Sequence, residues 1–150
     1  MAPIRHRSNS SNATHAANLT ANFVYTYYET YGYVLAAYNA SPVLPEFLGE
    51  ANYETANNTG TLSSSADAFI TRLEMWYSMT SGAGGHEFGN EHVSHFDSSW
   101  TSNLDTTATT QVHYLSQLFN AFPWWTFTPD QSHTVVTAGY GTPNTGNENL

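Results

Sequence analysis

The stretch that decides the fold runs from Pro45 to Glu54 and reads Pro-Glu-Phe-Leu-Gly-Glu-Ala-Asn-Tyr-Glu. Phe47 and Leu48 form a short apolar run, and a proline is tolerated at the first position of a strand, where no ladder hydrogen bond is lost. A glycine follows and leaves room beside the next side chain. The stretch therefore predicts a short buried strand that carries Glu50 at its C-terminal end.

Barrel and open-sheet enzymes hold their reactive groups at the carboxyl ends of parallel strands. Glu50 is thus a candidate catalytic residue, and the competing interpretation is a solvated glutamate in a loop after an edge strand. Polar residues suited to a sugar or another polyol follow within the next forty positions. They are Asn52, Tyr53, Glu54, His86, Glu87 and Asn90.

Composition restricts the class of protein. The 150 residues carry a formal net charge of -9, with three arginines and no lysine. We expect no nucleic-acid or membrane partner, because nucleic acids and anionic membranes attract a cationic surface. The chain has no cysteine, which excludes disulfides, thiolate metal sites and cysteine nucleophiles. No signal peptide is recognised at the start, and no apolar run reaches transmembrane length.

Hydrophobic periodicity and turn residues predict an α/β chain in which strands and helices alternate. A β-branched and aromatic run predicts a strand over residues 23–28, and a helix over 33–38 separates it from the strand of Glu50. Longer helices are expected over 66–81 and 106–120. Strand, helix, strand is the order of a parallel α/β layer.

Each longer helix has an apolar stripe, which we interpret as core packing. Ser64 and Asp67 are expected to form a capping box at the first helix, and Gly82 to end it. The residues expected to point inward are Phe69, Leu73, Trp76, Tyr77 and Thr80 in the first helix, and Val112, Leu115, Leu118, Phe119 and Phe122 in and after the second.

The glycine-rich stretch 81–90 lacks the Lys-Ser/Thr of a phosphate loop, so nucleotide binding is not supported. Its glycines suit a closely packed strand that turns sharply and leaves His86 and Glu87 at its top. A last strand is expected over residues 134–137. Beyond it, residues 139–150 are rich in Gly, Pro, Thr and Asn.

Several motifs resemble, in order and spacing, those of the apiosidase-like glycoside hydrolases. They are the Gly-Glu-Ala-Asn-Tyr-Glu run of 49–54, Arg72 with Trp76-Tyr77, the glycine-rich stretch 81–90, Pro123-Trp124-Trp125 and Pro129-Asp130. The resemblance implies a (β/α)8 TIM barrel followed by a small β-rich domain. We therefore expect a polar segment over 1–22, the last strands and helices of the barrel over 23–125, and a linker that enters a β-rich domain over 126–150.

The resemblance also implies roles for single residues. Glu50 matches the catalytic nucleophile, Tyr53 and Glu54 complete its motif, and His86 matches the histidine of a final-strand motif. Trp100 is matched to a tryptophan that lines the sugar pocket. Positions 51 and 52 read Ala-Asn where many relatives have Pro-Arg, so the sugar and the linkage stay open. The expected substrate-binding residues are Asn52, Tyr53, Glu54, His86, Glu87, Asn90 and Trp100.

A retaining glycosidase needs a second carboxyl group about 5–5.5 Å from its nucleophile. In the family this general acid lies on an earlier strand, upstream of the matched motifs. We therefore expect this chain to be a fragment of the enzyme, with little or no hydrolysis by itself. The complete enzyme is expected to be secreted or periplasmic and to act on side chains of plant or microbial polysaccharides. Exposed barrel edges would favour self-association. A carbohydrate substrate and no cofactor are expected.

Two other functions stay open. Three histidines and two glutamates lie within residues 86–95, and His92 and His95 have an i, i+3 spacing that can share a metal on a helix, although the segment is not His-Glu-x-x-His. The other alternative is a non-catalytic carbohydrate-binding module that uses aromatic faces as sugar platforms. Its candidates are Trp100, Trp124 and Trp125.

Overall fold

The computed structural model of the chain describes residues 18–27, 30–58, 62 and 64–139. Two parallel strands, β1 (Asn22–Tyr25) and β2 (Glu46–Glu50), are joined by helix α2 (Thr30–Tyr38). The later elements are α3 (Ala68–Thr80), α4 (Glu91–Ser94), the 3-10 helix η2 (Trp100–Asn103), α5 (Thr107–Asn120) and the 3-10 helix η3 (Trp124–Thr126). The expected mixture of strands and helices is confirmed, although β1 is shorter than the predicted strand.

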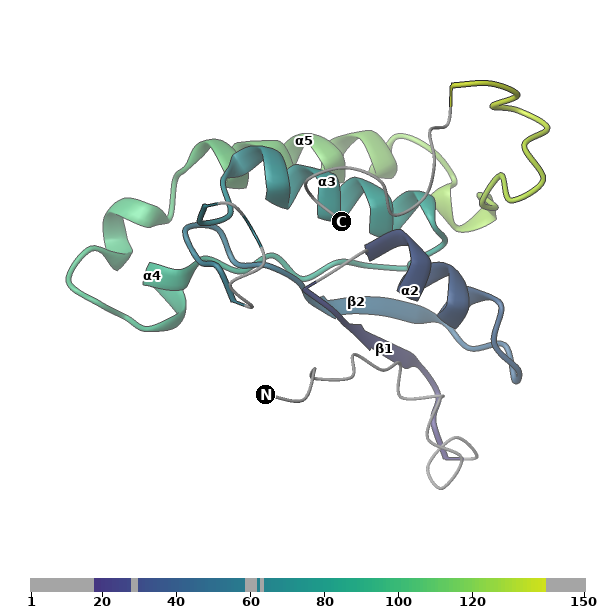
Figure 1. Cartoon of the computed structure of the whole chain (residues 1–150), viewed down its shortest axis with the longest axis horizontal. Helices are drawn as coiled ribbons and strands as arrows, with labels where there is room; N and C mark the ends of the chain where they lie inside the picture. Colours follow the sequence, from purple (N-terminus) through teal and green to yellow (C-terminus); the bar gives the residue numbers. More distant parts are fainter. Residues whose placement is uncertain (1–17, 28–29, 59–61, 63, 140–150) are drawn as a thin grey trace.

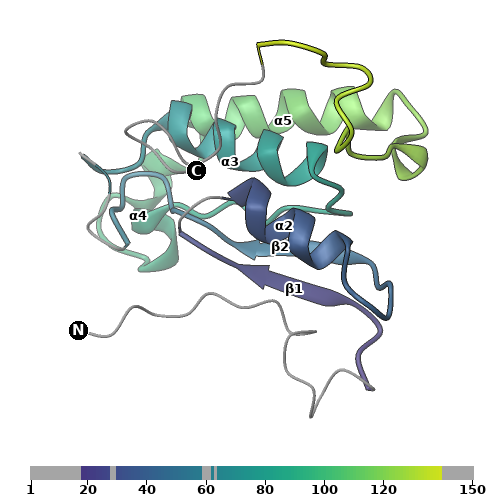
Figure 2. The ribbon, with the colours of Figure 1, turned by 45° about the vertical axis from the view of Figure 1, so that its right-hand side comes forward.

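The helices lie in layers on one side of the strands. Figures 1 and 2 show α2 and α3 beside the β1–β2 pair, with α5 packed against α3 farther from the strands. A third extended segment, residues 84–87, runs parallel to β2 along its other edge. The Leu48 N–H donates to the Gly85 carbonyl at 3.1 Å, and the Glu87 N–H donates to the Leu48 carbonyl at 2.9 Å.

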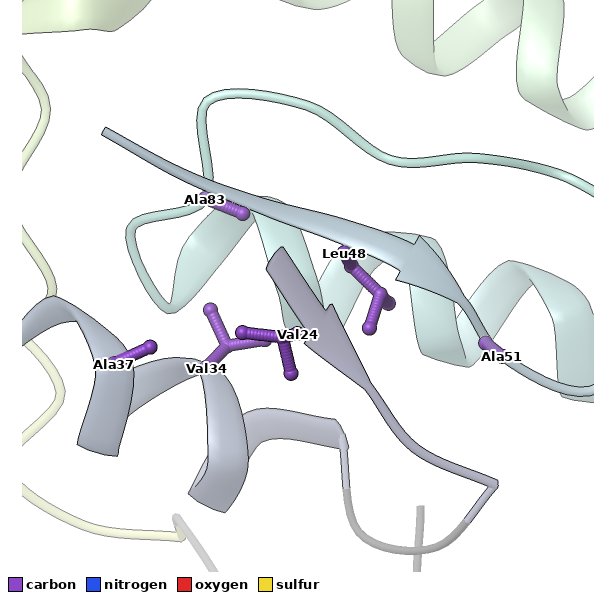
Figure 3. Packing of buried hydrophobic residues seen from close by; sticks show 6 residues of the cluster. All are labelled: Val24, Val34, Ala37, Leu48, Ala51 and Ala83. Carbon is purple, nitrogen blue, oxygen red and sulfur yellow. The ribbon is translucent and has the colours of Figure 1, made fainter. Parts of the chain in front are cut away.

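Small side chains form the core between the strands and α2. Each member is 3% exposed or less, and the members come from β1, α2, β2 and the residues that follow β2 and α3. Small groups allow the helix to lie close to the strands at high packing density. The cluster consists of Val24, Val34, Ala37, Leu48, Ala51 and Ala83 (Figure 3).

A β-bulge rotates the end of β2. Val24 pairs with Leu48 whereas Tyr25 pairs with Glu50, so Gly49 is an additional residue with no partner on β1. In a regular strand, the period of two would place Glu50 on the face of Leu48, toward the helices. The bulge turns Glu50 to the opposite face, which we call the inner face of the strands.

Aromatic rings from one strand cover glycines of the next strand on the inner face. A Cβ atom at Gly49 would lie 1.6 Å from Cε2 of Phe23, and one at Gly85 would lie 2.5 Å from the ring of Phe47. The two phenylalanine rings also contact each other, with centroids 6.2 Å apart. Because only glycine leaves this space open, the contacts help to fix the register of the three extended segments.

The N-terminus of α3 differs from the predicted capping box. Asp67 is the N-cap, and its carboxylate accepts from the N–H groups of Phe69 at 2.9 Å and Ile70 at 3.0 Å. Ser64 instead donates to the Ser65 carbonyl at 3.3 Å. The C-terminal stop is confirmed, since Gly82 has a φ of 107°, in the left-handed region that favours glycine.

The buried side of α3 also differs from the prediction. Phe69 of the expected stripe is 47% exposed. Trp76 and Tyr77 are half-buried. Trp76 contacts Phe119 of α5, and Tyr77 contacts Tyr31 of α2. The stripe thus packs helix on helix, and α3 has a second buried side that periodicity alone did not indicate. The fully buried residues of α3 are Ile70, Thr71, Glu74, Met75 and Ser78.

Helix α5 occupies the predicted range, but much of its apolar side is exposed. Leu115 is buried as expected, whereas Leu118 is 44% exposed and Phe122 is 50% exposed. The expected inward face is therefore only partly correct: Trp76 of α3 contacts Phe119, and the Phe127 ring contacts Phe119 and Phe122, but Leu118 and Phe122 remain about half exposed. Of the helices in the described ranges, none is both long enough and apolar enough to cross a bilayer.

The strand expected over residues 134–137 is wrong. The Asp130 carboxylate accepts from the N–H groups of Thr134 at 2.9 Å, Val135 at 3.1 Å and Val136 at 2.8 Å. These bonds hold the segment in a turn and occupy the donors that a strand would use. The continuation into a β-rich domain after residue 139 lies outside the described residues, as does most of the polar segment 1–22.

We predict that Gly49→Ala lowers the free energy of unfolding by about 1–3 kcal/mol, the usual cost of overpacking, because the new methyl group overlaps the Phe23 ring. Gly84→Ala is the matched control, since its Cβ would meet only the Glu46 carbonyl oxygen, at 3.4 Å. Urea denaturation of both variants measures the difference. Phe23→Leu in the Gly49→Ala background should restore part of the loss. Equal stabilities for the two glycine variants would contradict the overlap.

Candidate active site

Glu50 is half-buried at the C-terminal end of β2, on the inner face. The Tyr27 hydroxyl donates to the Glu50 carboxylate, and the hydroxyl oxygens of Tyr25 and Tyr27 are 2.8 Å apart. The two tyrosine rings meet edge to face, with centroids 5.2 Å apart. The ends of two neighbouring strands therefore converge on one carboxylate.

Tyr53 and Glu87 lie close to this carboxylate. Burial raises the pKa of Tyr53, and the charges of Glu50 and Glu87 together with a hydrogen bond to Glu50 raise it further. Glu87 is exposed, and alternation places it on the inner face because His86, its neighbour, faces α3. We call these five residues the inner-face cluster: Tyr25, Tyr27, Glu50, Tyr53 and Glu87.

The tyrosines of the cluster act as hydrogen-bond donors. Burial raises the pKa of Tyr27, and its hydrogen bonds with Glu50 and Tyr25 raise it further. Tyr27 thus stays protonated around neutral pH and holds the Glu50 carboxylate in place. Sequence analysis did not select Tyr25 or Tyr27. The available signal was their separation by two residues at the end of a strand, which puts both side chains on one face.

Asn52 does not face the cluster, although it lies two residues after Glu50. It is 3% exposed, and its side-chain amide donates to Oε1 of Glu74 at 2.7 Å and to the Tyr27 carbonyl at 3.2 Å. Its backbone N–H donates to the same Glu74 oxygen at 3.2 Å. The structure therefore places Asn52 in a buried link between β2 and α3 instead of on the inner face.

Glu74 is a buried carboxyl group that sequence analysis missed. It is 1% exposed, and burial raises its pKa to about 7, although the two bonds from Asn52 act in the opposite direction. The signal was its spacing of four residues from Ile70 and from Ser78, which places it on a buried side of α3. An acidic residue within an apolar helix is the kind of group that occurs at functional sites.

Glu54 and Asn90 form a junction with Thr106 beyond the strand ends. The Asn90 amide donates to Oε2 of Glu54 at 2.8 Å, and the Thr106 hydroxyl donates to the same oxygen at 2.9 Å. Asn90 also caps α4, and Thr106 caps α5. The structure thus brings two of the predicted site residues together, in a buried structural contact. We call these three residues the Glu54 junction.

His86 and Trp100 lie outside the inner-face cluster. His86 points to α3, where its Nδ1 is 3.5 Å from the Ser78 hydroxyl, and burial lowers its pKa to about 4, so the ring is neutral around pH 7. Trp100 lies in η2 and contacts Phe96 edge to face, with centroids 5.5 Å apart. Of the predicted site residues, the structure groups Glu50, Tyr53 and Glu87.

The histidine-rich segment 86–95 separates into pairs. His92 Nδ1 lies 2.6 Å from the Asp97 carboxylate, and His95 Nδ1 lies 3.5 Å from Glu91 Oε1. Within the described ranges, no group of three or more histidine or acidic side chains is arranged to hold a metal ion. Each histidine of the segment lies against a different side chain: His86 against Ser78, His92 against Asp97 and His95 against Glu91. The metal-binding alternative therefore gains no support.

Residues 2–126 match the sequence model of the family described as Apiosidase-like, catalytic domain. The chain belongs to this family. The motif resemblance is thereby confirmed for most of the apiosidase-like chain. A search among curated proteins gives no match.

The apiosidase-like chain is also similar to solved structures. One is a glycoside hydrolase family 5 protein from Bacteroides vulgatus ATCC 8482, with a TM-score of 0.72 and 19% identity over 83% of this chain and 34% of that chain. Another is described as a glycoside hydrolase, with a TM-score of 0.71 and 19% identity over 83% of this chain and 36% of that chain. The chain thus shares their fold and spans about a third of their length.

A second buried carboxyl group lies at the other end of β2 in the apiosidase-like chain. Glu46 is 3% exposed, and neither of its carboxyl oxygens has a hydrogen-bond partner among the described residues. Burial raises its pKa to about 8. The folded chain therefore favours the protonated form of Glu46, whereas an unfolded chain leaves it with an ordinary pKa.

We predict that part of the stability of the apiosidase-like chain is lost as pH rises from about 5 to about 8, because ionisation of Glu46 then opposes folding. The raised folded-state pKa means that the folded form binds more protons than the unfolded form across this window. Glu46→Gln should reduce the loss and be more stable than wild type at about pH 8. Chemical denaturation at several pH values measures it, and parallel curves for the two proteins would contradict it.

Proposed function

We propose that this chain is the C-terminal part of a retaining glycoside hydrolase with a (β/α)8 barrel, in which Glu50 is the nucleophile. The observation that carries the proposal is the position of Glu50 on the inner face, at the C-terminal end of a parallel strand and within reach of the Tyr27 hydroxyl. Family membership and the shared fold with glycoside hydrolase structures support it. Barrel enzymes carry their catalytic groups at this end of their strands.

The layered arrangement supports the barrel. In this proposal β1, β2 and the 84–87 segment are consecutive barrel strands, α2 and α3 lie outside, and the inner face lines the interior. Phe23 and Phe47 are each 36% exposed on that face, as expected for side chains that other strands of the barrel would cover. The remaining strands would come from the rest of the protein, since the chain spans about a third of the similar structures.

The proposed reaction has two steps. A Glu50 oxygen attacks the anomeric carbon, the bond to the glycosidic oxygen breaks, and a carboxylic acid protonates the leaving oxygen. In the second step the carboxylate left by that acid takes a proton from water, the water oxygen bonds to the anomeric carbon, and the bond from the sugar to Glu50 breaks, which restores both carboxyl groups. The two carboxyl groups must lie about 5–5.5 Å apart. By resemblance to the family the acid lies upstream, so the chain by itself should hydrolyse little.

The inner-face cluster suits a sugar ligand. Tyr53 and Glu87 offer a donor and an acceptor near Glu50, which is the chemistry that sugar hydroxyl groups require. We propose the side chains of plant or microbial polysaccharides as substrates and a secreted or periplasmic location, consistent with a polar composition without lysine. The exposed phenylalanines Phe23 and Phe47 favour self-association of the isolated chain.

We predict that Glu50→Gln in the complete enzyme lowers kcat by at least about a thousandfold, because no nucleophile remains. Glu46→Gln is the control, since it makes the same change at the other end of the same strand. A 2-deoxy-2-fluoro glycoside that accumulates the covalent intermediate should label Glu50, as located by mass spectrometry. An adduct on another residue, or near-normal activity of the Glu50 variant, would refute the assignment.

A carbohydrate-binding module is the second candidate, favoured by the 71% exposure of Trp125 in η3. Figure 1 places η3 at the end of the molecule opposite α4. Calorimetry with oligosaccharides separates the two functions. Binding that disappears in Trp125→Ala and persists in Glu87→Gln would favour the module, whereas binding that persists in Trp125→Ala and weakens in Glu87→Gln would favour the enzyme.

A further inference from the structure

A chain of hydrogen bonds connects the buried side of α3 with Glu50. Oε1 of Glu74 accepts from the backbone N–H and the side-chain amide of Asn52, and that amide also donates to the Tyr27 carbonyl. The Tyr27 hydroxyl in turn donates to Glu50. We propose that Glu74 is a positioning residue for Glu50 that acts through Asn52 and Tyr27. The inference rests on the proposed role of Glu50 as nucleophile.

Hydrogen bonds and the chain itself form a closed loop through Glu50, Tyr27 and Asn52 at the end of β2. Asn52 follows Glu50 by two residues along the chain, and its amide meets the backbone of the same tyrosine whose hydroxyl meets Glu50. Glu74 fixes Asn52 at two points, with distances of 2.7 Å and 3.2 Å. It therefore sets the distance between the ends of β1 and β2, and with it the fit of the tyrosine hydroxyl to the carboxylate.

Core packing does not account for a carboxyl group at position 74. Glu74 is 1% exposed, and a buried carboxylate is costly unless it is hydrogen-bonded. An apolar side chain of similar size would fill the same space without that cost. Two donors of Asn52, its backbone N–H and its side-chain amide, meet Oε1 of Glu74, whereas its Oδ1 is buried without a hydrogen-bond partner among the described residues. The orientation of the Asn52 amide thus depends on its donor side, where the Glu74 carboxyl group and the Tyr27 carbonyl accept.

At the contact between Glu74 and Asn52, Glu74 is the group that titrates near neutral pH. Burial raises its pKa to about 7. His86 from the 84–87 segment faces Ser78, and burial lowers its pKa to about 4. On the other sides of α3, Tyr31 of α2 contacts Tyr77, Phe119 of α5 contacts Trp76, and Arg72 lies over the Phe69 ring, with its guanidinium carbon 5.2 Å from the centroid.

The test compares Glu74→Gln, which keeps an acceptor oxygen, with Glu74→Leu, which keeps the volume and removes the acceptor. NMR spectra of the isotope-labelled 150-residue chain report the Asn52 amides and the Tyr27 hydroxyl proton. In wild type the Asn52 side-chain amide signals should shift with pH, with a midpoint near the pKa of Glu74, and both variants should lose this titration. In Glu74→Leu, hydrogen exchange at the Asn52 backbone amide should rise about tenfold and the Tyr27 hydroxyl signal should disappear.

Glu74→Gln should keep both the slow exchange and the hydroxyl signal, a rescue that a purely space-filling role would not require. Ser78→Ala, a buried change on the same helix outside the network, is the matched control and should alter neither. A folded Glu74→Leu chain with wild-type exchange at Asn52 and a wild-type Tyr27 hydroxyl signal would overturn the proposal.

If Glu74→Leu does not fold, Asn52→Ala breaks the same connection at its other end. Persistence of the Tyr27 hydroxyl signal in that variant would also overturn the proposal, and its loss would support it. None of these measurements uses catalysis. A failure of the positioning role is therefore distinguishable from a failure of Glu50 as nucleophile, which the adduct experiment on the complete enzyme decides.

Discussion

The Phe23 ring occupies the space that a side chain at position 49 would need, and the direction of Glu50 depends on this contact. A glycine there permits both the ring and the bulge, and the bulge turns the following carboxylate from the helix side to the inner face. The same relation recurs one strand farther on, where Phe47 covers Gly85. Aromatic residues, which make up 15% of the chain, thus set the relative positions of neighbouring strands as well as filling space.

Sequence analysis predicted the elements better than the faces of those elements. The strand of Glu50 and the ranges of α3 and α5 were evident, because apolar spacing and capping residues act locally. Sequence analysis expected Tyr53, Glu54, His86, Glu87 and Asn90 around Glu50, and the structure groups only Tyr53 and Glu87 with it. The direction of His86 and the burial of Asn52 were not predictable, because they depend on contacts with α3. The segment 134–137 has strand-like residues, but three of its backbone N–H groups donate to the Asp130 carboxylate.

The layer between strands and helices owes much of its order to polar contacts. Its apolar cluster is made of valine, leucine and alanine, whereas Asn52 and Glu74 are buried polar residues that link β2 to α3. Apolar contact is non-directional, so small residues alone would tolerate sliding of the helices over the strands. Hydrogen bonds with fixed geometry remove that freedom. The Glu74 carboxyl group thus lies where the ends of β1 and β2 are linked.

The Glu54 junction has a consequence for how this end of the molecule opens. One carboxylate oxygen accepts from Asn90 and from Thr106, which are 36 and 52 residues away along the chain, and these two residues begin α4 and α5. Contacts that share an acceptor are energetically coupled. We therefore expect local opening at the Glu54 junction to involve the starts of both helices together, as a single cooperative unit of unfolding.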